Sequence, residues 1–251
     1  MVSERPRIAA AAAIAAALLL AAHPAAAQEI SVDLGGQPLS LRLVQVFALV
    51  TLLSLAPGIA VMITCFPFMV TVLSILRQAV GVQQAPPNMM IVSLALFLTW
   101  FVMEPVFVEA WDAGLGPLAR GEAEPGPALE AGFAPFRAFM QARVDPDTLA
   151  EIAAAAPGRL AEEAGQGRLA AELGLLVPAF LLSEIQRGFE VGFLVFLPFL
   201  VIDLAVASIL MSMGMMMVPP AVVALPFKLA FFVLADGWTL LAGALVRSYS
   251  P

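Results

Sequence analysis

Three ionisable side chains lie within long apolar stretches near the end of the chain and are the first candidates for chemistry. They are Asp203, Lys228 and Asp236. A charged group at the centre of a membrane helix costs roughly 2.5 to 3.5 kcal/mol, so each should face protein or water. Lys228 and Asp236 would lie about 12 Å apart along one helix, which favours Asp203 as the partner of Lys228. This ion pair serves either transport or the packing of two helices, in one subunit or between neighbours.

Two aspartates on neighbouring apolar helices also suit an intramembrane aspartyl protease, in which paired carboxylates share a proton to activate water. The aspartates here stand in Ala235-Asp236-Gly237 and Ile202-Asp203-Leu204. Neither segment has the glycine-flanked context expected of such enzymes. The sequence therefore disfavours this catalytic class.

The sequence does not supply the residues that other catalytic mechanisms need. The single histidine, His23, lies in a segment expected to be removed, so no imidazole remains for a triad or a metal. Cys65 is the only cysteine, which excludes an intramolecular disulfide and a cysteine-based zinc site. The only lysine, Lys228, follows Leu-Pro-Phe and belongs to no Walker loop. We therefore expect no catalytic, cofactor or metal site.

Five of the twelve methionines fall within residues 211–217, just before Pro219 and Pro220. Methionine is unbranched and polarizable, so a cluster can close on itself and reopen around many shapes. A deformable seal needs this property, although filling an irregular gap in a helical hairpin is the alternative. The candidate seal consists of Met215, Met216 and Met217.

The composition is that of a membrane-associated chain. Only 12% of residues are charged and 61% are apolar, with a mean hydropathy of +0.96. Residues 1–27 are expected to be a cleavable signal peptide, because Arg5 and Arg7 precede a 15-residue apolar core and a run of three alanines. Removing this segment changes the formal charge from −7 to 10 − 18 = −8, so nucleic acid is an improbable partner.

The elements that must position these residues are helices. Four apolar segments follow the signal peptide, at residues 43–76, 89–103, 191–218 and 221–246. We expect an all-α, membrane-associated fold with two kinked hydrophobic hairpins, over residues 43–103 and 185–251. Between them, residues 104–184 hold 13 of the 19 acidic residues and are expected to form a helical periplasmic domain. Residues 28–42 are expected to form a short periplasmic segment before the first hairpin.

The two segments of the first hairpin look irregular. Pro57 and Pro67 should each end or kink a helix in a stretch too long for one crossing. The second segment covers only about 22 Å before Glu104 and Pro105, less than a hydrocarbon core of about 30 Å. Such segments fit helices that are packed on other protein chains. Arg77, in an acid-free loop, places that loop on the cytoplasmic side.

Local patterns complete the expected map. The middle domain has an apolar stripe at helical spacing, formed by Leu129, Phe133, Phe136 and Met140. Asp145 before Pro146 predicts the start of a second helix. Glu184, just before the third apolar segment, is either a solvated helix entry or a bridge to an arginine of a neighbouring subunit. Two turns are expected to close the hairpins, at Pro86, Pro87 and Asn88, with Asn88 as a helix cap, and at Pro219 and Pro220.

Together these motifs resemble the FliP family of flagellar type III secretion export-gate proteins, which has injectisome relatives (FliP/SctR). The resemblance extends over residues 44–249. Its motifs are Leu76-Arg77-Gln78-Ala79-Val80-Gly81, Ala85-Pro86-Pro87-Asn88, Leu94-Ala95-Leu96-Phe97-Leu98-Thr99, Ser183-Glu184, Gly192-Phe193, Pro198-Phe199, Ile202-Asp203, the segment from Gly214 to Pro220, Leu225-Pro226-Phe227-Lys228 and Asp236-Gly237-Trp238. The signal peptide and the proline pairs favour the flagellar branch.

The resemblance implies a channel subunit that is not an enzyme. Several copies, a homopentameric ring in the family, would form a helical, cone-like gate with the small subunits FliQ and FliR, beside FlhA and FlhB. Unfolded flagellar proteins would cross this gate in the basal body at the bacterial inner membrane, with a large part of the chain in the periplasm. The methionine triplet would form the pore gasket, and Glu184 would lie at contacts between subunits.

Some residues depart from the family pattern. Pro67 and Phe68 replace an expected Thr-Arg pair, Met89 replaces a glutamine, and Gln186 replaces a lysine. These changes affect salt bridges that would use the missing Arg or Lys. Two other functions stay open, a secondary transporter with broken helices and a structural membrane scaffold. Within the cluster, Met211 and Met213 are expected to pack against neighbours.

Overall fold

The computed structural model describes residues 39–82, 86–215 and 217–249. The predicted signal peptide, the segment that follows it as far as residue 38, and Met216 lie outside the described residues. Every regular element in the described part is helical, which confirms the all-α prediction. The chain divides into two compact units, residues 1–52 and 53–251. Of the first unit, the described part is the beginning of α2 (Leu39–Met62), where Leu43, Val46 and Phe47 are exposed.

The second unit contains the end of α2 and the remaining helices. These are α3 (Phe66–Val80), α4 (Asn88–Ala110), the π-helical turn η1 (Trp111–Leu115), α5 (Gly116–Ala119), α6 (Pro125–Arg143), α7 (Pro146–Ala155), α8 (Gly158–Gly165), α9 (Leu169–Ser212), α10 (Pro220–Leu234) and α11 (Gly237–Arg247). Two of them, α9 and the run from α4 to α5, are long and apolar enough to cross a membrane. Up to four spans result if each of two bent helix pairs counts as one.

The observed helix ends near the prolines differ from the predicted segment limits. α2 continues through Pro57 to Met62, and the break comes at residues 63–65. Pro67 lies in the first turn of α3, where its missing N–H costs nothing. α4 also continues past Glu104 and Pro105, so the predicted short segment is a helix of 23 residues. Both residues are exposed, so the charge needs no partner inside the protein.

The second half of the chain also differs from the predicted segments. α9 is a single helix of 44 residues that begins at Leu169, well before the apolar segment expected from residue 191. Residue 184, the predicted end of the middle domain, therefore lies inside a continuous helix. The last apolar segment is two helices, because α10 ends at Leu234 and α11 begins at Gly237 with a bend of 61° between them.

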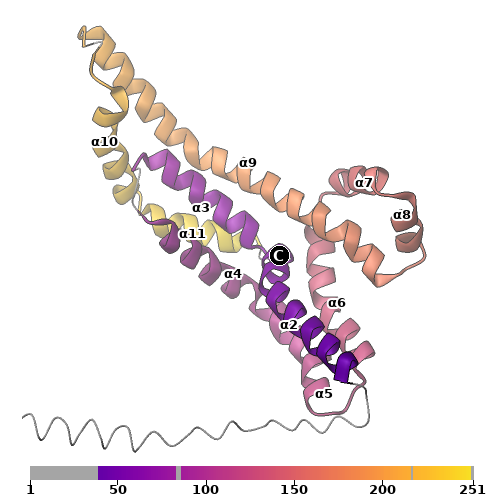
Figure 1. Ribbon diagram of the computed structural model, residues 1–251. Helices are drawn as coiled ribbons and strands as arrows, with labels where there is room; N and C mark the ends of the chain where they lie inside the picture. Colours follow the sequence, from indigo (N-terminus) through magenta and orange to yellow (C-terminus); the bar gives the residue numbers. More distant parts are fainter. Residues whose placement is uncertain (1–38, 83–85, 216, 250–251) are drawn as a thin grey trace, which may run out of the picture. The chain divides into compact units, whose positions relative to one another are not determined.

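The core of the second unit is built around α3. Figure 1 shows α3 lying beside α9 on one side, with α4 and α11 on the other. Its buried side chains are Pro67, Phe68, Met69, Val72, Leu73, Leu76 and Ala79. A second, smaller cluster joins α6 to α9 through Met140, Leu176 and Phe180. Phe133 and Phe136 of the predicted stripe pack on this cluster, whereas Leu129 is exposed.

Glycines set the close approach of α3 to α9. Gly188 and Gly192 are four residues apart and face Thr71 and Ile75 of α3, which have the same spacing. A Cβ added at Gly192 would lie 2.3 Å from Ile75 Cδ1, and one added at Gly188 would lie 3.0 Å from Thr71 Cβ. This is the small-xxx-small arrangement that lets two apolar helices come close.

A second glycine contact, between η1 and α6, yields a stability prediction. A Cβ at Gly114 would lie 2.4 Å from the Ala128 carbonyl oxygen and 2.6 Å from Gly132 Cα, and backbone atoms cannot rotate away. We expect Gly114→Ala to lower the free energy of unfolding by about 1–3 kcal/mol. A Cβ at Gly132 has its nearest neighbour at 3.5 Å, so Gly132→Ala is the matched control. Chemical denaturation of both variants in detergent checks this, and equal losses would contradict it.

Candidate functional site: the methionine loop and two buried charge clusters

Residues 213–219 connect α9 to α10, and the backbone of the described residues 213–215 and 217–219 follows from their sequence. Gly214 adopts a φ of +74°, and its N–H donates to the Met211 carbonyl at 3.0 Å. The Met215 N–H donates to the Leu210 carbonyl, also at 3.0 Å, which completes the Schellman motif that commonly ends helices at glycine. Pro219 and Pro220 then begin α10, as a turn at these prolines predicts. We call this segment the methionine loop.

The methionine side chains of this region are exposed. Met217 is 97% exposed and Met215 is 40% exposed, while Met216 lies outside the described residues. Met211 and Met213 are 64% and 65% exposed, so they do not pack within the chain. Methionine side chains thus project from the end of a hairpin whose first helix, α9, is the longest in the described ranges.

The first buried charge cluster joins three helices, and we call it the Lys228 clamp. Lys228 Nζ lies 2.6 Å from Asp203 Oδ2 and donates a hydrogen bond of 3.0 Å to the Ala79 carbonyl. Asp203 is the partner that the sequence predicted, and both members belong to the same chain. The Ala79 carbonyl is in the last turn of α3, where helix carbonyls attract a cation. The clamp therefore holds α10 against α9 and α3 together.

Asp236 takes no part in this cluster. It occupies the break between α10 and α11 in the left-handed region, with φ 49°, and its exposed carboxylate accepts a hydrogen bond from the Thr239 hydroxyl at 3.1 Å. The prediction that Lys228 and Asp236 share one helix was wrong, because Asp236 ends the helical run. Aspartate tolerates this backbone conformation better than most residues.

The second cluster surrounds Glu184, whose side chain is completely buried inside α9. Arg143 Nε lies 3.2 Å from Glu184 Oε1, and the Tyr249 hydroxyl donates to Oε2. Arg143 also donates to the Ser248 carbonyl at 3.0 Å and stacks over the Tyr249 ring. Arg187 Nη1 is more distant from the carboxylate, at 3.7 Å. We call these residues the Glu184 cluster; it ties the end of the described chain to α6 and α9.

Neighbouring polar groups extend this cluster to α7. The Ser183 hydroxyl accepts a hydrogen bond of 3.0 Å from the Asp145 backbone N–H and donates to the Ala179 carbonyl. Asp145 caps α7 as predicted, because its Oδ1 accepts from the Thr148 N–H at 2.8 Å. Hydrogen bonds from the Thr148 amide and hydroxyl lower the pKa of Asp145. Burial, followed by the Glu184 charge, raises the pKa of Tyr249, which keeps its hydroxyl protonated as a donor.

Sequence reasoning identified Glu184 but missed its partners. It expected a solvated helix entry or an arginine of a neighbouring subunit, whereas the structure supplies Arg143 of the same chain, 41 residues away. Tyr249 is the single tyrosine of the chain and was missed as well. A lone tyrosine just after an apolar segment was the available signal, because a buried tyrosine hydroxyl usually finds a partner.

The turn after α3 also differs from the prediction. Arg77 lies in the last turn of α3 and not in a loop. Pro86 and Pro87 precede α4, and Pro87 occupies the cap position that was expected of Asn88. Asn88 is the first residue of the helix, and its side-chain oxygen accepts a hydrogen bond from Arg77. The amide side chain therefore ties α4 to α3 and does not cap the helix.

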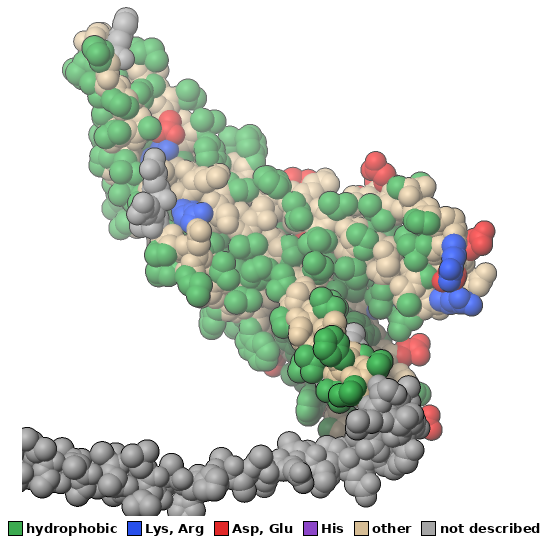
Figure 2. All heavy atoms as spheres, in the orientation of Figure 1, with side chains coloured by type: hydrophobic (Ala, Val, Ile, Leu, Met, Phe, Trp, Pro, Cys, Tyr) green, Lys and Arg blue, Asp and Glu red, His purple; other side chains and the backbone are tan. Residues whose placement is uncertain are grey.

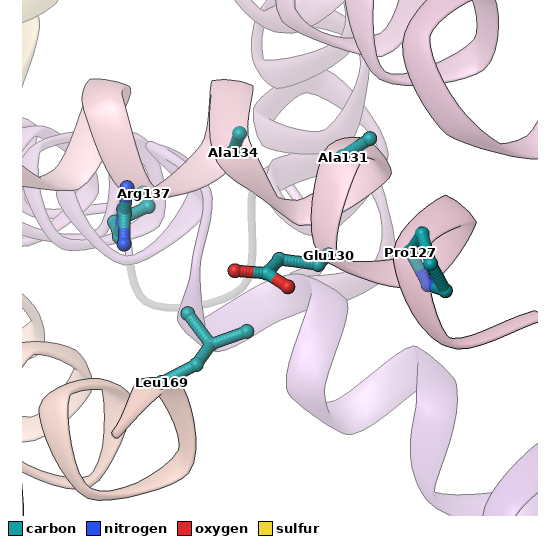
Figure 3. Close-up of a pocket in the computed structure, with 6 residues that line it drawn as sticks. All are labelled: Pro127, Glu130, Ala131, Ala134, Arg137 and Leu169. Atoms are coloured by element: carbon teal, nitrogen blue, oxygen red, sulfur yellow. The ribbon is translucent and has the colours of Figure 1, made fainter. Parts of the chain in front are cut away.

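A hollow of about 300 Å³ lies between α6 and the start of α9 (Figure 3). Glu130 and Arg137 of α6 face it, and Leu169 lines it from α9. Arg137 is already paired with Glu172 at 3.3 Å. In the described ranges, no three histidine, cysteine or acidic side chains are grouped so that they could hold a metal ion.

The surface of the second unit is unusually apolar for a protein exposed to water. Figure 2 shows hydrophobic side chains over most of the visible face along α9, α10 and α4, with fewer charged side chains, several of them near α7 and α8. Large exposed residues on α4 include Phe97, Trp100 and Phe101. An apolar surface of this extent indicates contact with lipid or with other protein chains.

Comparisons with known proteins agree with these features. A family model described as the FliP family matches residues 49–245. The flagellar biosynthetic protein FliP of Caulobacter vibrioides is 53% identical over 223 residues, which cover 88% of this chain and 82% of that protein. The Rhizobium meliloti protein of that name is 47% identical, over 90% of this chain and 93% of the relative. The Bacillus subtilis protein is 41% identical, over 82% and 91% respectively.

Proposed function

Because this chain belongs to the FliP family, we propose that it is a core gate subunit of the flagellar type III protein export apparatus and that its methionine loop closes the pore. The relatives that match most of the chain are flagellar biosynthetic proteins. The chain also has helices suited to a membrane. In this proposal Met215, Met216 and Met217 line a closed channel through which unfolded flagellar proteins pass.

One observation carries the gasket proposal, the exposure of the methionine side chains at the end of the α9–α10 hairpin. Met217 has almost no contact within the chain, although a methionine side chain gains by burial. The loop backbone beneath it is held by the Schellman motif. Contact is therefore expected to come from the same loop of other copies, and flexible thioether side chains then close the gap between them.

The apolar surface supports assembly into a larger complex. Exposed apolar side chains on α4, α9 and α10 need partners that a single chain does not supply. We propose several copies, a homopentameric ring, together with FliQ and FliR and beside FlhA and FlhB. The complex would lie in the flagellar basal body at the bacterial inner membrane, with α6, α7 and α8 in the periplasm. A detergent-extracted complex with the mass of one chain would contradict this assembly.

The two alternatives receive less support. A secondary transporter needs charges free to meet a substrate or ion near the middle of the membrane. Lys228 instead holds Asp203 and a backbone carbonyl of its own chain. A scaffold in which methionines only fill space needs packed side chains, whereas Met215 and Met217 are exposed in the single chain.

Cysteine scanning tests the gate against the scaffold. Met215→Cys, Met216→Cys and Met217→Cys, each in the assembled complex, are expected to react with a bulky thiol reagent and to crosslink to an export substrate stalled in transit. The native Cys65 is fully buried, so the parent chain is expected not to react with the thiol reagent and serves as the negative control. Leu245→Cys, at a buried site on α11, is the unreactive control. Three unreactive loop positions that never crosslink to substrate would leave the methionines as packing filler.

A further inference from the structure

Few residues of α10 are fully buried. Only Ala224 and Lys228 are buried along its 15 residues. Val222, Val233 and Leu234 are the most exposed, whereas the rings of Phe231 and Phe232, near the α11 end, lie 5.8 and 6.3 Å from the Phe199 ring of α9. Segments with few buried apolar contacts move at low energetic cost. Phe231 and Phe232 therefore hold the end of α10 next to α11, and Lys228 is the buried charged contact that holds the helix further toward the methionine loop.

The Lys228 clamp is an incomplete ion pair. Lys228 is buried and uses Asp203 Oδ2 and the Ala79 carbonyl, whereas the Asp203 side chain as a whole is 32% exposed. The other carboxylate oxygen, Asp203 Oδ1, is buried without a hydrogen-bond partner among the described residues. An unpaired buried oxygen costs free energy, so the closed clamp keeps part of the desolvation cost of the pair. This residual cost lowers the energy needed to open the clamp.

The other end of α10 is a break built for a sharp change of direction. Asp236 is the one non-glycine residue in the described ranges with a positive φ. Gly237 follows, and a Cβ there would lie 2.2 Å from the Phe232 ring. Beyond the break, α11 buries Leu241 and Leu245, and the chain continues into the hydrogen bonds of the Glu184 cluster.

We propose that α10 is a movable arm that turns about Asp236 and Gly237 while α11 stays in place, and that Lys228 is the contact that releases it. This inference rests on the proposed function, since a gate needs an element that moves its pore loop. An arm of 15 residues is about 22 Å long, so a turn of about 15° moves its far end by about 6 Å. The end that moves most is the end that begins after the methionine loop.

Distances between paired spin labels on the full chain in lipid nanodiscs test the arm. The first pair, Leu194→Cys on α9 and Val222→Cys on α10, reports on the arm. The second pair, Leu182→Cys and Leu240→Cys, reports on α11, and a third, Leu182→Cys and Gln78→Cys, reports on α3. All five positions are exposed, and Cys65 is fully buried.

The variant Lys228→Met removes the cation and keeps an unbranched side chain of similar length. The first pair is expected to shift or broaden by several ångströms, while the second and third pairs keep the parent distances. Leu229→Met, at an exposed neighbour on α10, is the matched control and should leave all three pairs unchanged. Asp203→Asn weakens the clamp and should give a smaller shift of the first pair alone. If Lys228→Met fails to fold, Asp203→Asn alone tests whether the clamp restrains α10.

Two results would overturn the proposal. An unchanged first pair in both clamp variants would show that Lys228 does not restrain α10. A joint shift of the first and second pairs would show that α10 and α11 move as one block, so that Asp236 and Gly237 are not the pivot. The ion conductance of the assembled complex that carries the clamp variants tests the gate function separately. If the arm moves and the conductance does not change, the gate function is rejected and the pivot at Asp236 and Gly237 is retained.

Discussion

Replacing Met215, Met216 and Met217 together with glycine is expected to make the assembled complex leak small ions. The three side chains fill the pore in the proposed closed state, and glycine leaves that volume to water. A methionine side chain adapts its shape to its neighbours, so the remaining methionines could fill the space left by a single replacement. All three are therefore replaced together. Conductance across planar bilayers that contain the purified complex measures the leak, and so does the permeability of cells that make the variant.

The matched control for this experiment is an exposed methionine elsewhere in the chain. Met89 and Met90, at the start of α4, are exposed as well, and replacing both with glycine removes the same kind of side chain from a different place. We expect their conductance to equal that of the parent. Parent-level conductance in the triple variant would reject the gasket proposal while leaving the family membership intact.

The variant Arg143→Met is expected to lower the free energy of unfolding by about 3–5 kcal/mol, because it leaves a completely buried carboxylate without its main cation. Glu184 would keep only the Tyr249 hydroxyl and the more distant Arg187. Chemical denaturation of the full chain in detergent measures the loss. The double variant Arg143→Met, Glu184→Leu should recover most of it, since an apolar pair of similar volume carries no buried charge.

A surface pair of the same residue types gives the control. Arg159 and Glu163 lie 3.0 Å apart on α8, and Arg159 is exposed to solvent. Arg159→Met should cost about 0.5 kcal/mol or less, as surface ion pairs do. Equal losses for Arg143→Met and Arg159→Met would mean that the Glu184 cluster contributes no more than an ordinary surface pair.

Local sequence patterns predicted the helix ends well where one residue decides them. Asp145 before Pro146 marked the start of α7, and Pro219 with Pro220 marked the start of α10. These signals work because a cap or a proline acts on the backbone within one turn of itself. Pro57 and Pro105 were misleading, since a helix that is supported by neighbours tolerates the loss of one hydrogen bond.

For the charges inside apolar segments, the sequence likewise predicted some of the contacts and missed others. Sequence reasoning found Asp203 and Lys228 as partners, because an unpaired charge is costly in an apolar setting and few candidates existed. It did not find the Ala79 carbonyl, which any residue type could have provided. Asp236 was placed on one helix with Lys228, although its backbone conformation ends that helix.

The sequence by itself determined the helical, membrane-suited class, the family, and the types of residue in the methionine loop and the charge clusters. Composition, periodicity and local backbone preferences carry that information, and each acts over a few residues. Only the tertiary structure decided that Arg143 and Tyr249 enclose Glu184, and that Lys228 also donates to the Ala79 carbonyl of α3. The physical reason is that these contacts join residues 41 to 149 positions apart, and packing brings such residues together without leaving a local sequence signal.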